Sequence, residues 1–331
     1  MTHSGGHATR STLAGSLSVL AASVLWGTTG TAATFAPAVG PLAIGAAAMG
    51  LGGLLQALVA APHITRHTTH LRGQSGIVLL GAVAVAVYPL AFYTSMRLAG
   101  VTVGTVVSIG SAPLAAAVIE RVIDRRRLTY RWMLGAVLGL TGTVLLCLAQ
   151  ALNAHSGPTN ASGGDAVLGV GLGLVAGLTY ALYTWTAHRL IHRGVASRAA
   201  MGTIFGLGGV LLLPVLLATG TPLISSWSNA AVGVYMALVP MFAGYALFGW
   251  GLNHVPASTA TTLSLVEPAI AAVLAVLVVG ERLPAPGWAG IALITGCLVV
   301  LTRAEPTRHE QADRRGSPRP EARRSPPARV R

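Results

Sequence analysis

The sequence predicts an all-α integral membrane protein with ten transmembrane helices arranged as two inverted five-helix repeats. The first observation is composition: 53% of the 331 residues are hydrophobic, only 9% are charged, and the mean hydropathy is +0.67. The second is a series of ten apolar windows, most of them close to the ~20 residues that a helix needs to cross a bilayer. The third is a match between the two halves of the chain, over 56 positions without a gap.

The windows place the spans and divide the chain. A short segment at 1–12 precedes a first repeat at 13–152, and a linker at 153–165 leads into a second repeat at 166–303. The remaining residues, 304–331, are rich in Arg and Pro and poor in apolar side chains, so we expect a disordered basic tail. The windows themselves are 13–36, 39–61, 76–96, 101–119, 132–152, 166–187, 199–220, 230–252, 257–280 and 287–302.

The net charge of +13 follows the predicted topology and needs no nucleic-acid partner. All 22 basic residues are arginine, and 20 of them fall in loops or tails on one side of the predicted membrane. Only Arg97 and Arg282 fall on the other side. Because cytoplasmic loops collect positive charge, this split predicts that both termini are cytoplasmic and that the 153–165 linker is extracytoplasmic.

The internal match indicates inverted symmetry. A shift of 155 residues places Ala91–Leu146 over Ala246–Leu301, with Pro113 on Pro268 and Gly135 on Gly290. Each half holds five spans, and because five is an odd number the second half enters the membrane upside down relative to the first. Inverted repeats of this kind are typical of secondary transporters, whose substrate site lies near the midplane between the repeats.

Glu267 is the strongest candidate for a functional residue. It lies deep inside the apolar window at 257–280, where a carboxylate costs at least a few kcal/mol unless it faces protein or water. It could carry a coupling proton or pair with a cationic group of a substrate. The alternative is a hydrogen-bonded anchor between helices. Its counterpart in the first half is Ala112, so the repeat symmetry is broken at this position.

Two prolines are predicted to kink helices that border the cavity. A proline lacks an N–H and leaves the carbonyl four residues earlier without its helical partner. Pro113 therefore frees the carbonyl of Ile109, and Pro268 frees that of Ser264. A packing kink without ligand contact is the alternative for either one.

Aromatic residues are only 5% of the chain, so those inside spans are candidates for stacking on a substrate. Helix packing is the alternative for each of them. Trp26 and Tyr180 are favoured because they occupy matching places in the two halves. The aromatic residues singled out within spans are Trp26, Tyr88, Tyr93, Tyr180, Tyr183, Tyr235 and Trp250, and all of them except Tyr235 are predicted site residues.

Other polar and small residues have simpler expected roles. Glu120 and Asp124 lie at a span end among arginines, where ion pairing at headgroup level is expected. Glycines spaced four apart, Gly135 with Gly139 and Gly169 with Gly173, allow close helix approach either within the bundle or between protomers.

The chain resembles EamA-type members of the drug/metabolite transporter superfamily. The resemblance rests on Trp26-Gly27, on Glu267-Pro268 followed by Gly280-Glu281-Arg282-Leu283, and on Gly290 and Gly296. It implies a ten-helix fold, a central cavity lined mainly by spans 1, 3, 4, 6, 8 and 9, and peripheral spans 5 and 10. It also implies transport of small metabolites or drugs, commonly outward.

The predicted function is therefore a secondary active transporter in a bacterial plasma membrane. We expect efflux of amino-acid-like or amine substrates by alternating access, with protons as a candidate coupling ion. The sequence has no Walker A motif and no His-Glu-x-x-His or paired-aspartate cluster, so we expect no enzyme activity, cofactor or metal. The expected partners are the lipid bilayer and a small molecule. Uptake, a non-transporting scaffold and a homodimer remain open alternatives.

Overall fold

The computed structural model describes residues 4–99, 101–153, 163–279 and 283–302. Within these ranges the chain is helical apart from turns and short connections, and it has no strand. Ten helical stretches are long and apolar enough to cross a membrane, which confirms the ten predicted spans. The predicted linker between the repeats lies mostly outside the described residues, and Gly280-Glu281-Arg282 and the predicted tail lie wholly outside them.

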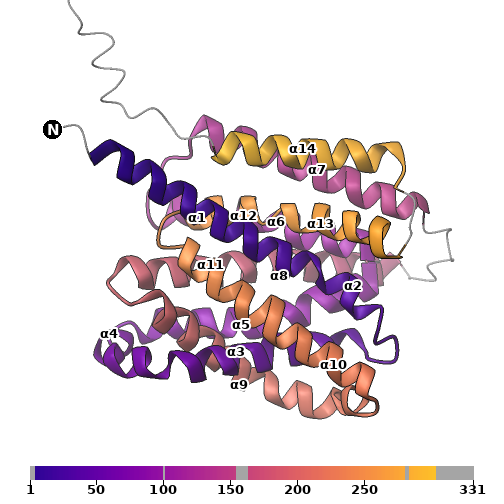
Figure 1. Ribbon diagram of the computed structural model, residues 1–331, viewed down its shortest axis with the longest axis horizontal. Helices are drawn as coiled ribbons and strands as arrows, with labels where there is room; N and C mark the ends of the chain where they lie inside the picture. Colours follow the sequence, from indigo (N-terminus) through magenta and orange to yellow (C-terminus); the bar gives the residue numbers. More distant parts are fainter. Residues whose placement is uncertain (1–3, 100, 154–162, 280–282, 303–331) are drawn as a thin grey trace, which may run out of the picture.

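The spans run along the horizontal direction of Figure 1. In the first half the helices are α1 (Ser4–Gly27), α2 (Thr29–Ala33), α3 (Pro41–Arg66), α4 (Thr68–Arg72), α5 (Ser75–Ala99), α6 (Val101–Val122) and α7 (Tyr130–Asn153). In the second half they are α8 (Gly163–His192), α9 (Ser197–Thr219), η1 (Thr221–Ile224), α10 (Trp227–Met236), η2 (Ala237–Gly244), α11 (Tyr245–Gly251), α12 (Ala257–Leu263), α13 (Val266–Leu274), η3 (Ala275–Val279) and α14 (Ala285–Thr302).

Equivalent helices of the two halves pack against each other. Span 2 (α3) lies along span 7 (α9), and span 5 (α7) lies along span 10 (α14). The α7–α14 pair forms one edge of the bundle in Figure 1, as expected for peripheral spans. Span 3 (α5) packs on span 6 (α8), and the equivalent pair is span 8 with span 1 (α1). These pairings agree with a two-repeat arrangement, while the opposite orientation of the repeats stays a prediction.

Small residues allow this close packing. A Cβ atom added at Gly142 on α7 would lie 2.7 Å from the carbonyl oxygen of Gly290 on α14. At Gly135 and Gly139 it would meet side chains of the same bundle, 2.8 Å from Leu301 Cγ and 2.7 Å from Leu265 Cδ1. Gly169 and Gly173 likewise face α5. The glycine spacings are thus used within the bundle.

Three spans are interrupted within the membrane-crossing length. Span 1 breaks at Thr28, between α1 and α2, and span 8 contains the π-helical segment η2 around Pro240. Span 9 breaks at Ser264 and Leu265, between α12 and α13. The Ser264 carbonyl, deprived of a partner by Pro268, accepts the Glu267 N–H at 3.0 Å. Pro113, in contrast, lies inside an unbroken α6.

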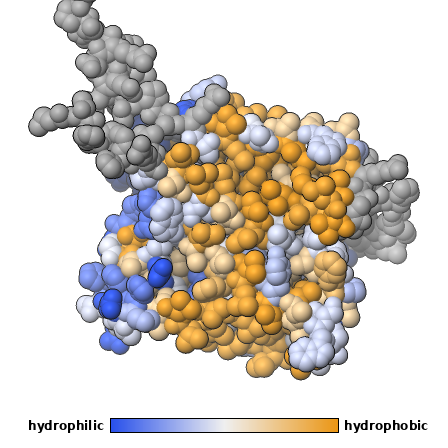
Figure 2. All heavy atoms as spheres, in the orientation of Figure 1, coloured by the Kyte–Doolittle hydropathy of each residue, from blue (hydrophilic) through white to orange (hydrophobic). Residues whose placement is uncertain are grey.

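The arginine-bearing connections come together at one end of the bundle. Arg193 beyond α8 donates to Gln74 before α5 at 3.2 Å, and Arg131 on α7 donates to the Val300 carbonyl near the end of α14 at 3.0 Å. Figure 2 shows hydrophilic residues gathered at this end and an apolar band across the middle of the molecule. We call this end of the bundle, which holds Gln74, Arg131, Arg193 and Val300, the arginine-rich end.

Candidate functional site

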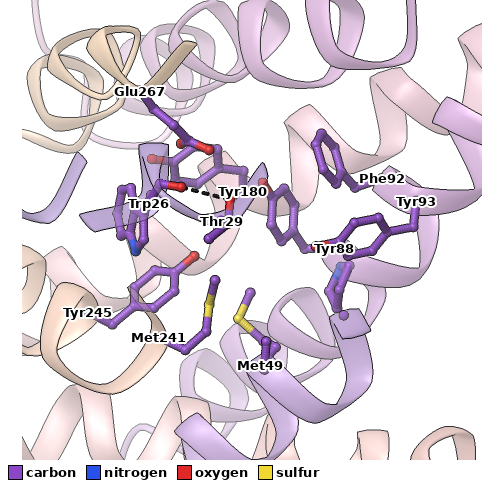
Figure 3. A pocket seen from close by; sticks show the side chains of 13 residues that line it. Trp26, Thr29, Met49, Tyr88, Phe92, Tyr93, Tyr180, Met241, Tyr245 and Glu267 are labelled. Carbon is purple, nitrogen blue, oxygen red and sulfur yellow. Dashed lines mark hydrogen bonds between the residues drawn. The ribbon is translucent and has the colours of Figure 1, made fainter. Parts of the chain in front are cut away.

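A small cavity lies inside the bundle, beside the interrupted spans. Its wall is built from spans 1, 2, 3, 6, 8 and 9, so residues from both halves of the chain line it. The cavity volume is about 50 Å³. Figure 3 shows Glu267 entering from one side, aromatic rings around the middle, and Met49 and Met241 opposite. Glu267 is the only charged residue in the described lining.

The break in span 9 positions Glu267. The side chain stands in the first turn of α13, directly after the break, and is partly buried. Among the described residues, none donates a hydrogen bond to its carboxylate or forms an ion pair with it. The anchor alternative therefore has no support in the described structure. A carboxylate inside a membrane without a protein partner is left to water, a proton or a bound cation.

The aromatic lining forms a continuous cluster. Tyr88 lies 5.6 Å from Tyr180, and Trp26 lies 4.7 Å from Tyr245, measured between ring centroids. Tyr180 is stacked on Tyr183 at 5.2 Å. These distances fall in the range of favourable ring–ring contacts, so the cluster holds its own shape around the cavity.

Hydrogen bonds fix two of these rings to the interrupted helices. The Tyr180 hydroxyl donates to Ser264 Oγ at 2.7 Å, and Ser264 Oγ donates to the Thr261 carbonyl at 2.8 Å. Tyr180 on α8 thus holds the break that carries Glu267. Trp26 Nε1 donates to the Pro240 carbonyl in η2 at 2.9 Å. A π-helical segment disturbs the regular ladder, and Trp26 satisfies one of its carbonyls.

The structure brings most of the predicted site residues to this cavity. Glu267, Trp26, Tyr88, Tyr93 and Tyr180 all line it. Tyr183 stands behind them, buried, with its hydroxyl 2.8 Å from that of Tyr245.

Trp250 and the two predicted kinks do not belong to the lining. The Trp250 side chain is 45% exposed at the outer surface and packs on His254 at 4.4 Å. Trp250 comes five residues after the lining residue Tyr245 in α11, so at about 3.6 residues per turn it points to a different side of the helix. Pro113 and Pro268 are buried, but neither lines the cavity. The proline that does line it is Pro89 of α5. Span 2 lines the cavity in the place expected for span 4.

Sequence reasoning missed Tyr245, Phe92, Met49 and Met241, which also line the cavity. Phe92 lies between Tyr88 and Tyr93 and stacks on Tyr88 at 5.7 Å, so the aromatic density of this segment was an available signal. Tyr245 follows Gly244, where a Cβ atom would lie 2.7 Å from Trp26 Nε1. This glycine next to a tyrosine indicates close packing only once the partner helix is known.

A wider cavity of about 550 Å³ opens at the arginine-rich end. Asp124, on its rim, forms an ion pair with Arg189 and accepts a hydrogen bond from Trp185 Nε1 at 2.7 Å, so its predicted ion pairing is confirmed.

The expectation for Glu120 was wrong, because its side chain is only 2% exposed. Its carboxylate accepts hydrogen bonds from the backbone N–H and the hydroxyl of Ser258, at 3.1 and 2.7 Å. It therefore caps the start of α12, where unpaired N–H groups favour an acidic partner. Because Glu120 lies on α6 and Ser258 on α12, the contact joins the two halves of the chain.

Comparison with known proteins agrees with this architecture. A model described as the EamA-like transporter family matches residues 13–148 and 167–303. The chain is 36% identical over 290 residues to an uncharacterized transporter, YwfM, of Bacillus subtilis, covering 87% of this chain and 94% of that protein. It is 28% identical over 221 residues to the threonine/homoserine exporter RhtA of Salmonella typhimurium, covering 64% and 68% of the two chains.

One solved crystal structure superposes with a TM-score of 0.69 at 20% identity, covering 92% of this chain and 99% of the other. At this level of identity the likeness supports the fold alone.

Proposed function

Since the chain belongs to the EamA-like transporter family and is a membrane transporter, we propose that it is a secondary active exporter of amino-acid-like or amine substrates. Its substrate site is the central cavity, and protons supply the driving force. The name of the relative RhtA, an exporter of two amino acids, supports the outward direction.

The observation that carries this proposal is the carboxylate of Glu267, which has no partner among the described residues and faces a cavity lined by both halves of the chain. A buried carboxylate can be neutralised by a proton or by a cationic substrate group. If both use the same carboxylate, binding of one displaces the other, and the proton gradient can then drive the substrate against its own gradient.

Alternating access requires that the cavity open to one side at a time. At the arginine-rich end the two halves are tied by Glu120 with Ser258 and by Asp124 with Arg189 and Trp185. The interrupted spans 1, 8 and 9 are the places where helices can bend without losing a regular ladder. We propose that breaking the two ties and bending these spans opens the cavity toward the arginine-rich end.

The arginine split supports a cytoplasmic location for the arginine-rich end and for both termini. The wider cavity would then be the cytoplasmic entrance for exported substrates.

A vesicle assay tests the proposal. Inverted and right-side-out membrane vesicles are compared, with and without a pH gradient, over a panel of radiolabelled amino acids and amines. We expect gradient-dependent accumulation of at least one compound in inverted vesicles, and no accumulation with Glu267→Gln. Asp165→Asn, which removes an exposed acid at the start of α8, is the matched charge-loss control. Normal gradient-driven transport by Glu267→Gln would overturn the proposal.

A further inference from the structure

We propose that the central cavity selects organic cations that carry an amine and an aromatic or apolar body but no free carboxylate. This inference deepens the proposed function and rests on it. It chooses between the two substrate classes, because an amine and an amino acid of the same body differ by one negative charge.

The charges of the lining favour a lone cation. Glu267 supplies one negative charge, and none of the described lining residues is basic. The chain has no lysine at all. Arg97 stands one helical turn beyond Tyr93 on α5, but its side chain is exposed and does not line the cavity. A bound monocation would neutralise Glu267 and leave no charge without a partner.

The aromatic rings supply the second part of a cation site. Trp26, Tyr88, Tyr180 and Tyr245 surround the space into which Glu267 points (Figure 3). Ring faces attract ammonium groups, most strongly where water is excluded. The same faces stack on an aromatic substrate body, so both ends of an arylalkylamine find complementary surfaces.

A zwitterionic amino acid would bring its own carboxylate into the same space. No described lining group carries a positive charge to neutralise it, and Glu267 would repel it. The Tyr180 and Thr29 hydroxyls already donate, to Ser264 Oγ and to the Trp26 carbonyl at 2.7 Å. The other lining hydroxyls are neutral and could donate to a carboxylate without offsetting its charge. A buried charge without a partner is costly, and we expect the amino acid to bind at least ~100-fold more weakly than its amine.

The cavity must widen to admit such a ligand. Its volume of about 50 Å³ holds only one or two water molecules. Met49 and Met241 form the wall opposite Glu267, and unbranched methionine side chains repack readily (Figure 3). Gly45 and Ala48 keep the α3 side of the wall thin. The side facing Glu267 is therefore the adaptable side, which suits bodies of differing size.

The test measures binding to the purified full-length chain in detergent micelles by isothermal titration calorimetry. The probes share one body: phenethylamine, phenylalanine methyl ester, phenylalanine and phenylacetate. We expect the first two to bind, phenylalanine to bind at least ~100-fold more weakly, and phenylacetate not to bind. Glu267→Gln is expected to abolish amine binding while eluting as a monodisperse peak, and Asp165→Asn is expected to bind normally.

Paired variants separate the ring face from its hydroxyl. Tyr88→Leu removes the ring and should bind phenethylamine about 10-fold more weakly, whereas Tyr88→Phe keeps the ring and should lose clearly less affinity than Tyr88→Leu. Equal affinity for phenylalanine and phenethylamine would overturn the inference, as would failure of both amines to bind at millimolar concentration. Phenylalanine binding that disappears in Arg97→Gln would also overturn it, by revealing a hidden carboxylate partner.

The outcome separates this inference from the proposed function. Selective amine binding without gradient-driven transport in vesicles would leave the inference standing and remove the transport proposal. Glu267-dependent export of free phenylalanine, with equal binding of the amine and the amino acid, would support the transport proposal and overturn this inference.

Discussion

Replacing Glu120 with alanine should destabilise the protein, because this carboxylate joins the two halves of the chain at the arginine-rich end. The substitution removes two hydrogen bonds to a charged acceptor, each contributing about 1.5–3 kcal/mol, and leaves the Ser258 N–H and hydroxyl unpaired. Part of this loss, which sums to about 3–6 kcal/mol, is offset because a buried charge also disappears. We expect a net loss of about 2–4 kcal/mol.

Thermal unfolding in detergent, followed by tryptophan fluorescence at one fixed scan rate, measures this loss. For a chain of this length about 2 °C per kcal/mol is expected, so Glu120→Ala should lower Tm by roughly 4–8 °C. Ser258→Ala removes only the hydroxyl bond and should cost about 1.5 kcal/mol. Asp124→Ala breaks a partly exposed ion pair with Arg189 and also removes the acceptor of the Trp185 Nε1 hydrogen bond, so it should cost about 2 kcal/mol.

The double variant Glu120→Ala/Ser258→Ala completes a cycle that isolates the contact. Because Glu120 and Ser258 are in contact, the stability losses of the two single variants should not add. The loss in the double variant should be smaller than their sum by more than about 1 kcal/mol. Strict additivity, or a Tm for Glu120→Ala within 1 °C of the unchanged protein, would refute the assignment of Glu120 as the cap of α12.

Two further predictions follow from contacts elsewhere in the bundle. Gly290→Ala places a Cβ atom 2.6 Å from a backbone carbonyl of α7 and should cost about 1–3 kcal/mol in the same unfolding assay, whereas Gly296→Ala on the same helix, with its nearest neighbour at 3.8 Å, should be neutral or slightly stabilising. Equal effects would contradict the close approach of α14. Trp26→Phe leaves the Pro240 carbonyl without its donor, so it should lower the stability by about 1–3 kcal/mol and reduce transport. Trp250→Phe, at the outer surface, should change neither stability nor transport. Transport that is reduced by Trp250→Phe alone would place the site elsewhere.

The spans and the central acid could be predicted because each has a local signal. Apolar windows of bilayer length have few alternative structures, and the ten predicted spans agree with the ten observed. Glu267 was identifiable because a charge in such a window is costly. Its lack of a described partner could not be predicted, since it depends on side chains that other spans bring to it.

The remaining site residues depended on helix rotation, which the sequence constrains weakly in a membrane. Trp250 was predicted to be a site residue because it is aromatic and lies inside a span. The π-helical segment η2 and the following helix α11 instead turn the Trp250 side chain toward the outer surface. Tyr245 lies in the same span and was not among the candidates, although it faces the cavity. Apolar side chains suit both lipid and protein, so periodicity does not reveal which face of a span is inside.

Glu120 has a sequence context that is typical of the surface, but the residue is buried. Its position among arginines favours a surface ion pair, yet the helix brings it under α12, where the free N–H of Ser258 binds it. Only the distant start of another span explains this burial. Long-range capping between repeats leaves no local signal in either segment.

Proton flux in proteoliposomes tests the central claim most directly. Purified protein is reconstituted with a pH-sensitive dye inside, and the substrate identified in the vesicle panel is added outside without an imposed pH gradient. The account predicts that substrate entry drives protons outward, raising the internal pH, and that Glu267→Gln shows no proton movement. Proton flux of unchanged size in Glu267→Gln, or substrate entry with no proton movement in the unchanged protein, would contradict it.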